Sequence, residues 1–569
     1  MRPFIYAVGR RRRSVTPAGR RERRRGSDSG SERCGRTPAL DTLQRPSFCT
    51  LTLIDATGMA GNEDEDAFVQ YGIDDKPPLG KSLLLGAQHY LTMVGANIAV
   101  PLLLAGAMGM PDAVIPRFVG TFFVVSGIAT LAQTTLGNRY PIVQGAPFSM
   151  LAPALAVIGV VTANPPEGIV AWRAALLQLQ GAIIVAALAE VAIGYLGLVG
   201  RLRKHLSPVV IVPVIVLIGL SLFNAPEITT TDQNWWLVGL TLATIVLFSQ
   251  YLGERSQIFQ LFPVLLGMVV AWILAAALSV FGVVGADAPG YVDLASVAAA
   301  DPVHLIYPLQ WGVPSVTPAF VIGMLAGVAA SIVESIGDYH AVARLSGMGA
   351  PSSERMTHGI GMEGLMNVFS GVMGTGGSTS YSENIGAIGL TGVASRYVVQ
   401  IGAALMIVVG FVGYFGQLVA TIPSPIIGGL YIAMFAQIVG VGLSNLKYVD
   451  LDSSRNIFII GIALFSGLAV PEYLRSVGSA DAFQQGLADS VLLGPLLGVD
   501  VVANTIYVIG STGMAVGGIV AFFLDNSVAG TAAERGLTAW EEATESDAEF
   551  TSAYDRYVSD EEPTRADRP

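Results

Sequence analysis

Three carboxylate side chains lie in or beside apolar stretches of the sequence, where a buried charge is costly. Glu334 and Asp338 are four residues apart and therefore share one face of a helix. Glu383 stands near the end of the polar run 374–384, just before a short apolar stretch. Acids inside an apolar span are by default functional, and these suggest a cation or proton site together with acceptors for a substrate N–H group. Simpler alternatives are a solvated helix end for Asp338 and an N-terminal cap for Glu383.

Other polar residues in apolar segments are weaker candidates. Gln88 and His89 form an amide and imidazole pair in the first apolar segment, where a buried histidine is more often structural than a proton carrier. We expect Glu190 to pair with a neighbouring helix and Glu363 to lie at a membrane interface.

The elements that must position these residues are transmembrane helices. Of 569 residues, 52% are hydrophobic and only 13% are charged, which excludes disordered, fibrous and ordinary soluble proteins. Many apolar segments are long enough to cross a hydrocarbon layer of roughly 30 Å as helices. There are fourteen candidate spans, at 82–106, 117–136, 141–161, 174–198, 206–223, 235–252, 257–284, 316–338, 359–373, 379–391, 397–422, 425–444, 456–471 and 502–525.

The segment 1–58 differs in composition from the rest of the chain. Its first 50 residues hold 13 Arg and 4 acids, and it contains both cysteines of the chain, but it lacks the apolar stretch of a secretory signal. We interpret 1–58 as a disordered or mis-assigned start, with Met59 beginning an acidic segment over 59–81. The alternative is a basic tail that binds anionic lipid or nucleic acid.

The basic residues of the connecting loops indicate an orientation. Ten of them follow even-numbered spans and three follow odd-numbered spans. Because cytoplasmic loops carry the excess of Lys and Arg, the loops after even spans are expected to be cytoplasmic. An even number of spans then places both termini in the cytoplasm, including the acidic tail 526–569, and predicts a multi-pass protein of the cell membrane.

Two spans are interrupted at corresponding positions of the two seven-span halves. In span three, the run 143–149 places Gly145 and Pro147 at mid-membrane, and in span ten the run 374–384 is polar and rich in glycine. Paired interruptions are typical of transporters built from two repeats, and because seven is odd the repeats are inverted. A half-helix that starts at a break points its N–H groups inward, so we expect the substrate there.

The residues from Glu383 to Gly392 resemble the signature of the nucleobase-ascorbate transporter family, also called nucleobase:cation symporter 2, which includes xanthine and uracil permeases. That signature reads Gln, Glu or Pro, then Asn, any residue, Gly, four residues of any type, Thr, and Arg, Lys or Gly. Gln88-His89 resembles the family's first-span motif, and Glu334 to Asp338 resembles its eighth-span acidic motif. The resemblance covers most of 80–525.

The resemblance implies an all-α membrane fold of about fourteen spans in two inverted repeats, with short antiparallel strands in spans three and ten. It divides the chain into a core (spans 1–4 and 8–11) and a gate (spans 5–7 and 12–14), and it implies a homodimer. The core halves would then be 82–198 and 316–422, and the gate halves 199–284 and 425–525.

The resemblance also implies roles for single residues. Glu334 and Glu383 would hydrogen-bond a base, on which the Phe148 ring would pack. Backbone near Ser382 would add contacts and Asn384 would support the site. The remaining implied residues are a proton- or cation-linked network of Gln88, His89 and Asp338, and the signature positions Thr391 and Gly392, which bear on specificity.

The hints about substrate conflict. Glu at the first signature position, here Glu383, resembles the residue found in uracil carriers and argues against ascorbate as the substrate. Gly392 at the last signature position, and Asp338, look more like the residues of bacterial xanthine and urate carriers. A buried carboxylate favours a planar partner with adjacent N–H donors, and both uracil and xanthine have them.

The sequence therefore predicts a secondary active transporter that imports a nucleobase together with a proton or a sodium ion, by movement of the core against the gate. The alternatives are a carrier of ascorbate or another organic anion with the same fold, and a passive channel. An enzyme is not expected, because no metal-ligand cluster, nucleotide-binding loop or nucleophile and base pair occurs in the sequence. We expect no cofactor, no metal and no nucleic-acid partner, and membrane lipid as the surroundings.

Overall fold

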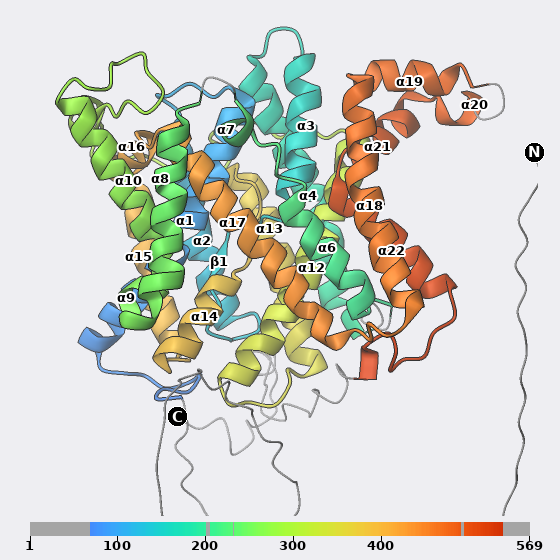
Figure 1. The fold of residues 1–569 in the computed structure, drawn as a ribbon, viewed down its shortest axis with the longest axis horizontal. Coiled ribbons are helices and arrows are strands. Elements are labelled where there is room, and N and C mark those ends of the chain that lie inside the picture. Colours follow the sequence, from blue (N-terminus) through green and yellow to red (C-terminus); the bar gives the residue numbers. More distant parts are fainter. Residues whose placement is uncertain (1–68, 201–204, 231–232, 491–493, 539–569) are drawn as a thin grey trace, which may run out of the picture. The chain divides into compact units, whose positions relative to one another are not determined.

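The computed structural model describes residues 69–200, 205–230, 233–490 and 494–538, which all belong to one compact unit, Asp64–Pro569. The described chain is almost entirely helical, with two very short strands (Figure 1). The elements are α1 (Leu79–Met108), α2 (Ile115–Thr135), β1 (Gln144–Gly145), α3 (Leu151–Ala163), α4 (Ala171–Tyr195), α6 (Pro208–Leu220), α7 (Pro226–Thr229), α8 (Trp235–Val246), α9 (Gln257–Leu261), α10 (Pro263–Val280), α11 (Leu294–Ala298), α12 (Pro318–Leu345), α13 (Ser353–Met373), β2 (Thr379–Ser380), α14 (Ser382–Thr391), α15 (Arg396–Phe411), α16 (Gly413–Ala420), α17 (Ser424–Ser444), α18 (Ser454–Val477), α19 (Ala480–Ala488), α20 (Gly494–Leu497), α21 (Asp500–Gly510) and α22 (Gly513–Ser527). The prefix 1–58 and most of the acidic tail lie outside the described residues, so what was predicted for them stays a prediction.

The predicted membrane fold is confirmed, whereas the count of fourteen spans stays a prediction. Eight described helices are long and apolar enough to cross a membrane, and α21 and α22 together make a ninth candidate. The last span was expected to be one helix over 502–525, but α21 and α22 meet at 92°. At the start of α22 the backbone approaches α18 closely, since a Cβ on Gly513 would lie only 2.4 Å from the carbonyl oxygen of Gly467.

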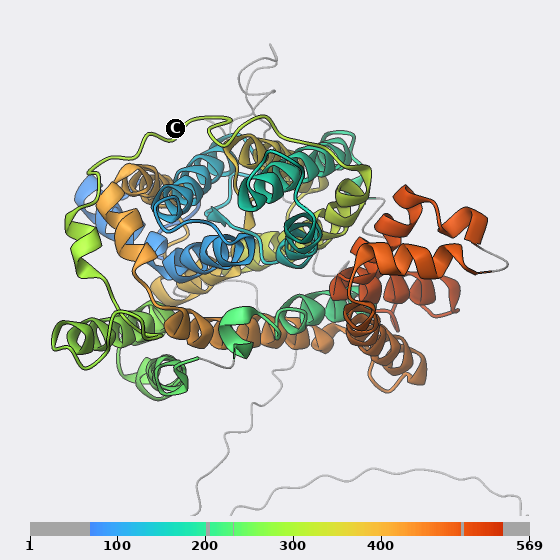
Figure 2. The same cartoon turned by 90° about the horizontal axis from the view of Figure 1, so that it is seen from above.

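The helices form two packed groups, which Figure 2 shows from above. In one group α13 packs on α4 and α15 packs on α2, with α1 and α12 beside them. In the other, α17 contacts α6 and α8, α10 packs on α8, and α18 and α22 pack on α6. A row of helices therefore lies along one side of a thicker bundle, and α12 contacts both groups through α4 and α6.

The two strands lie where both breaks were predicted, in the middle of the helical bundle (Figure 1). They pair antiparallel, with Gln144 opposite Ser380 and Gly145 opposite Thr379. Backbone groups freed from helical bonding at this depth must find partners inside the protein. The strand pair supplies some of them, and side chains supply others: Thr130 Oγ1 accepts the Gln144 N–H at 2.9 Å. The predicted short strands of spans three and ten are thus confirmed.

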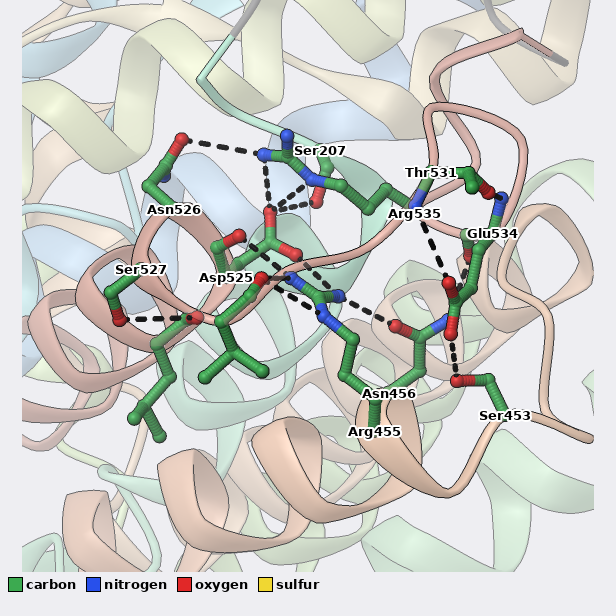
Figure 3. A network of polar contacts seen from close by, with 12 residues as sticks. Ser207, Ser453, Arg455, Asn456, Asp525, Asn526, Ser527, Thr531, Glu534 and Arg535 are labelled. Atoms are coloured by element: carbon green, nitrogen blue, oxygen red, sulfur yellow. Dashed lines mark hydrogen bonds and ion pairs between the residues drawn. The ribbon is translucent and has the colours of Figure 1, made fainter.

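A buried ionic network fixes the segment that follows α22 (Figure 3). Asp525 is fully buried and lies 3.0 Å from Arg455 and 2.7 Å from Arg535, and Ser207 Oγ donates to the same carboxylate at 2.7 Å. The segment therefore joins the start of α6, the start of α18 and the end of α22. Asn456 Nδ2 extends the network by donating to the carbonyl oxygen of Glu534 at 2.7 Å.

Asp525→Ala is expected to lower the free energy of unfolding by about 3–5 kcal/mol, because breaking a buried ion pair leaves two guanidinium groups without their counter-charge. Thermal unfolding of the purified protein in detergent measures this loss. The matched control is Asp112→Ala, since Asp112 is exposed. Equal unfolding temperatures for the two variants would contradict the stabilising role of the network.

Candidate binding site in the central cavity

A cavity of about 610 Å³ opens between the two groups of helices. Its lining comes from α6, α12, the start of α14, α17 and the residues around Phe148. Glu334, Asp338 and Glu383 supply carboxyl groups to its wall. The lining also includes His340 and Arg344 from the last two turns of α12, and Lys447 from the short 3-10 helix Asn445–Tyr448 that follows α17. The structure thus brings together three predicted acids that are up to 49 positions apart in sequence.

Glu334 and Glu383 are half-buried in the cavity wall. Glu334 stands on the straight helix α12, and its Oε2 atom is shielded from solvent without a hydrogen-bond partner. Glu383 lies in the first turn of α14, where the N-terminal end of a helix favours negative charge. The two carboxyl groups and that of Asp338 are close enough to repel one another. Acceptors held in this way suit a ligand that brings N–H donors.

Asp338 is buried and held by two serines of the second break. Ser380 Oγ donates to Asp338 Oδ2 and Ser382 Oγ donates to Asp338 Oδ1, each at 2.6 Å. The alternative of a solvated helix end for Asp338 is therefore wrong, because only 6% of the residue is exposed. These bonds join α12 to the start of α14 and so hold the two sides of the carboxyl wall together.

Aromatic rings form a second wall of the cavity. The Phe148 and Tyr381 rings are nearly parallel, at 17° with centroids 6.4 Å apart, and Phe435 lies edge-on to Phe148 at 6.3 Å. Tyr381 is fixed because its hydroxyl donates to the Ala146 carbonyl at 2.8 Å. Gly145 is required beneath this ring, since a Cβ there would lie 2.5 Å from it. Flat apolar faces beside acceptors favour a planar ligand.

Asn384 links the two breaks by hydrogen bonds outside the cavity lining. Its Oδ1 atom accepts the Val143 N–H at 3.0 Å, and its Nδ2 group donates to the Pro141 carbonyl at 2.9 Å. Asn384 is completely buried and is not part of the cavity lining. Its predicted supporting role stays a prediction.

Four predicted residues lie away from the cavity. His89 is buried on α1 near the backbone of Val393, and Gln88 is half-buried beside it. Thr391 and Gly392 end α14 at the opposite end from Glu383: Thr391 Oγ1 donates to the Ala387 carbonyl, and Gly392 caps the helix with a φ of 65°. Their predicted parts in coupling and specificity stay predictions, and none of the four contacts the cavity.

Glu363 and Glu190, which were weaker candidates from the sequence, occupy buried positions in the core of the structure. Glu363 was expected at a membrane interface, but it is 1% exposed and lies in the middle of α13, bonded to hydroxyl groups of α12 and β2. Glu190 does bond to a neighbouring helix, as expected, because Asn367 Nδ2 donates to its Oε2 atom at 2.8 Å. An acid flanked on both sides by small and apolar residues was the available signal for both.

Within the described ranges no three His, Cys, Asp or Glu side chains are grouped so that they could hold a metal ion. What the arrangement can do is hold a small planar solute between two half-helices, in a cavity among membrane-length helices. These features define a membrane transporter. The permease family model (Xan_ur_permease) matches residues 80–476, so the chain belongs to the nucleobase-ascorbate transporter family. It is therefore a transporter and not an enzyme.

Relatives from animals and plants agree with this assignment. Solute carrier family 23 member 2 of Homo sapiens is 40% identical over 528 residues, which cover 86% of this chain and 78% of that protein. Nucleobase-ascorbate transporter 2 of Arabidopsis thaliana is 32% identical, with 83% of this chain and 91% of that protein covered. In fold, the chain is similar to the murine Slc26a9 anion transporter in the inward-facing state, with a TM-score of 0.52, 12% identity and coverage of 69% of this chain and 66% of that chain.

Proposed function

We propose that this protein imports a neutral nucleobase, uracil or a xanthine-type purine, by symport with a proton. The observation that carries the proposal is the pairing of Glu334 and Glu383 in one wall of the cavity with the flat rings of Phe148 and Tyr381 beside them. Adjacent N–H groups of a base can donate to the carboxylates while its plane lies on an aromatic ring. Ser382, in the same wall, offers a further polar contact.

The charge of the cavity wall favours a neutral substrate over an organic anion. Three carboxyl groups, those of Glu334, Asp338 and Glu383, face the cavity, and the basic Arg344 and Lys447 come from helix ends. An anion such as ascorbate would meet repulsion from the carboxylates and would leave their hydrogen-bonding capacity unused. A base with two N–H donors satisfies them, so nucleobase transport is the better fit.

Transport in this proposal is movement of a core against a gate. The core contains α1–α4 and α12–α16, and the gate contains α6–α10 and α17–α22. Both carboxylates of the site and both strands belong to the core, whereas Ile211 of α6 and Ile438 of α17 face them from the gate with apolar side chains. Because all three carboxyl groups of the lining lie on the core side, the substrate can travel with the core. We also propose that both termini lie in the cytoplasm and that the protein forms a homodimer.

Uptake of radiolabelled uracil and xanthine by cells that lack their own carriers tests the function. We expect one of the two bases to accumulate, unlabelled nucleobase to compete, and a protonophore to collapse the accumulation. Control cells express a Glu334→Gln variant. Failure of both bases to accumulate and to compete would refute nucleobase transport, and uptake of labelled ascorbate in its place would support the organic-anion alternative. Dependence on external sodium, with resistance to the protonophore, would refute proton coupling.

A further inference from the structure

A buried cluster of oxygen atoms lies behind the cavity wall, between α12, α13 and β2. Its centre is the Glu363 carboxylate, which accepts hydrogen bonds from Ser331 Oγ at 2.9 Å, Thr379 Oγ1 at 2.8 Å and Tyr339 OH at 3.2 Å. Ser335 Oγ lies within 2.8 Å of both carboxylate oxygens. Every one of these residues is at most 1% exposed. None of them contributes to the cavity lining, so base binding does not account for the cluster.

The cluster is connected to the cavity by a continuous row of hydroxyl groups. Ser335 Oγ is 3.0 Å from Ser380 Oγ, and Ser380 donates to Asp338 at 2.6 Å. Asp338 itself belongs to the cavity lining. When Asp338 carries a proton, it donates to Ser380, whose hydroxyl turns toward Ser335. The proton can then reach Glu363 through the two serines, each of which accepts one proton and releases another. Asp338 ends the transfer ionised, Glu363 ends it neutral, and the serines are unchanged.

Glu190 is a second buried carboxyl group beside Glu363. Its side chain packs on Gly364 of α13, and it is completely buried. Asn367 Nδ2 donates to Glu190 Oε2 at 2.8 Å, while Glu190 Oε1 has no partner and no exposure to solvent. The two carboxyl groups interact electrostatically, so ionising both would create like charges in a dry environment.

No basic side chain of the described residues pairs with either carboxyl group. The titratable groups of α12 that interact with them are Tyr339 and Glu334, neither of which is a cation at neutral pH. Asp338 is linked to Glu363 only through Ser380 and Ser335. Strand β2 and Asn367 of α13 present only hydroxyl and amide groups. Two neighbouring carboxylates without a counter-charge are prohibitively costly at this depth, and a bound proton removes one charge.

The spacing of the oxygens fits a proton better than a metal ion. The hydroxyl groups of Ser331, Ser335 and Thr379 bond to Glu363 at 2.7–2.9 Å, which is the ordinary distance of O–H···O hydrogen bonds. Thr379 Oγ1 also lies 2.7 Å from Ser331 Oγ and 3.3 Å from Ser335 Oγ. An ion would have to part these oxygens in order to lie between them. In the structure, these oxygens are joined directly to one another by hydrogen bonds.

We propose that Glu190 and Glu363 form a proton-holding carboxyl pair in the core, which Ser335 and Ser380 connect to the substrate cavity through Asp338. The proposal rests on the proposed symport and names where its coupling proton is held. The proton then moves with the core, which is also the group of helices that carries the base. Glu334 and Glu383 are then free to bind the substrate as acceptors.

Infrared difference spectra of the purified protein test the pair without any substrate. At neutral pH we expect the C=O stretching band of a protonated, weakly hydrogen-bonded carboxyl group, shifted in D₂O. Glu190→Gln and Glu363→Gln should each remove or shift this band, while Glu167→Gln, a change at an exposed loop residue, should leave it intact. A wild-type spectrum without the band, or a band that survives in both Gln variants, would overturn the proposal.

Transport by the same variants tests whether this proton is the coupling proton. Glu190→Gln should keep exchange of internal for external base but lose at least 10-fold in accumulation against a gradient. Ser335→Ala, which keeps both carboxyl groups, should slow accumulation, with Ser370→Ala as its control because the Ser370 hydroxyl bonds only to the Met366 carbonyl of its own helix. Undiminished accumulation by Glu190→Gln refutes the coupling role. A wild type that transports no base refutes the proposed function instead, and the infrared result still decides about the pair.

Discussion

Glu334→Gln is expected to lower the affinity for the transported base roughly 10- to 150-fold, because each hydrogen bond to a charged group contributes about 1.5–3 kcal/mol. The amide cannot replace the carboxylate as a pure acceptor, since its NH₂ group would face the N–H donors of the base. At low substrate concentration, uptake should therefore fall to background. Binding of labelled base to the purified variant, together with uptake by cells, measures the loss.

The control for this prediction is Glu354→Gln, the same chemical change at an exposed position in the first turn of α13. It should leave the KM and the maximal rate of uptake unchanged. Surface abundance of both variants has to match the wild type, so that a loss of uptake is a loss of binding. If Glu334→Gln kept the wild-type KM, the carboxylate would not contact the substrate and the orientation of the base in the cavity would have to be different.

The position of the site could be predicted from the sequence because two kinds of signal coincide there. Breaks with Gly and Pro at mid-membrane, as at Gly145 and Pro147, are rare in smooth spans, and acids such as Glu334 are rare inside them. Each signal is local, so neither needs knowledge of the fold. Together they indicate a cavity wall, and the structure places Glu334, Asp338 and Glu383 in one such wall.

What the sequence could not supply is the direction in which each side chain points. Glu363 and Glu383 are both acids in or beside apolar stretches, yet Glu363 faces a dry hydroxyl cluster and Glu383 faces the cavity. Thr391 and Gly392 belong to the same motif as Glu383, but ten residues of helix carry them to its far end. At the bend between α21 and α22, Gly513 packs against the backbone of Gly467, which is far away in the sequence.

Asn384→Ala is expected to disable the site although Asn384 is not part of the cavity lining. The change leaves the Val143 N–H and the Pro141 carbonyl without partners in a fully buried place, and each unsatisfied group costs about 1–3 kcal/mol. The first break would then lose its attachment to α14. Because Phe148 lies in that break and Glu383 lies in α14, the aromatic and carboxyl walls would no longer be held in register.

The measurements are the unfolding temperature of the purified variant and its binding of labelled base. We expect both to fall, whereas Asn164→Ala, at an exposed position after α3, should change neither. A variant that unfolds at a lower temperature but binds with the wild-type affinity would show that Asn384 stabilises the strands without positioning the site. A variant unchanged in both would mean that β1, β2 and the other buried side chains that bond to this backbone, such as Thr130, suffice to hold the two breaks together.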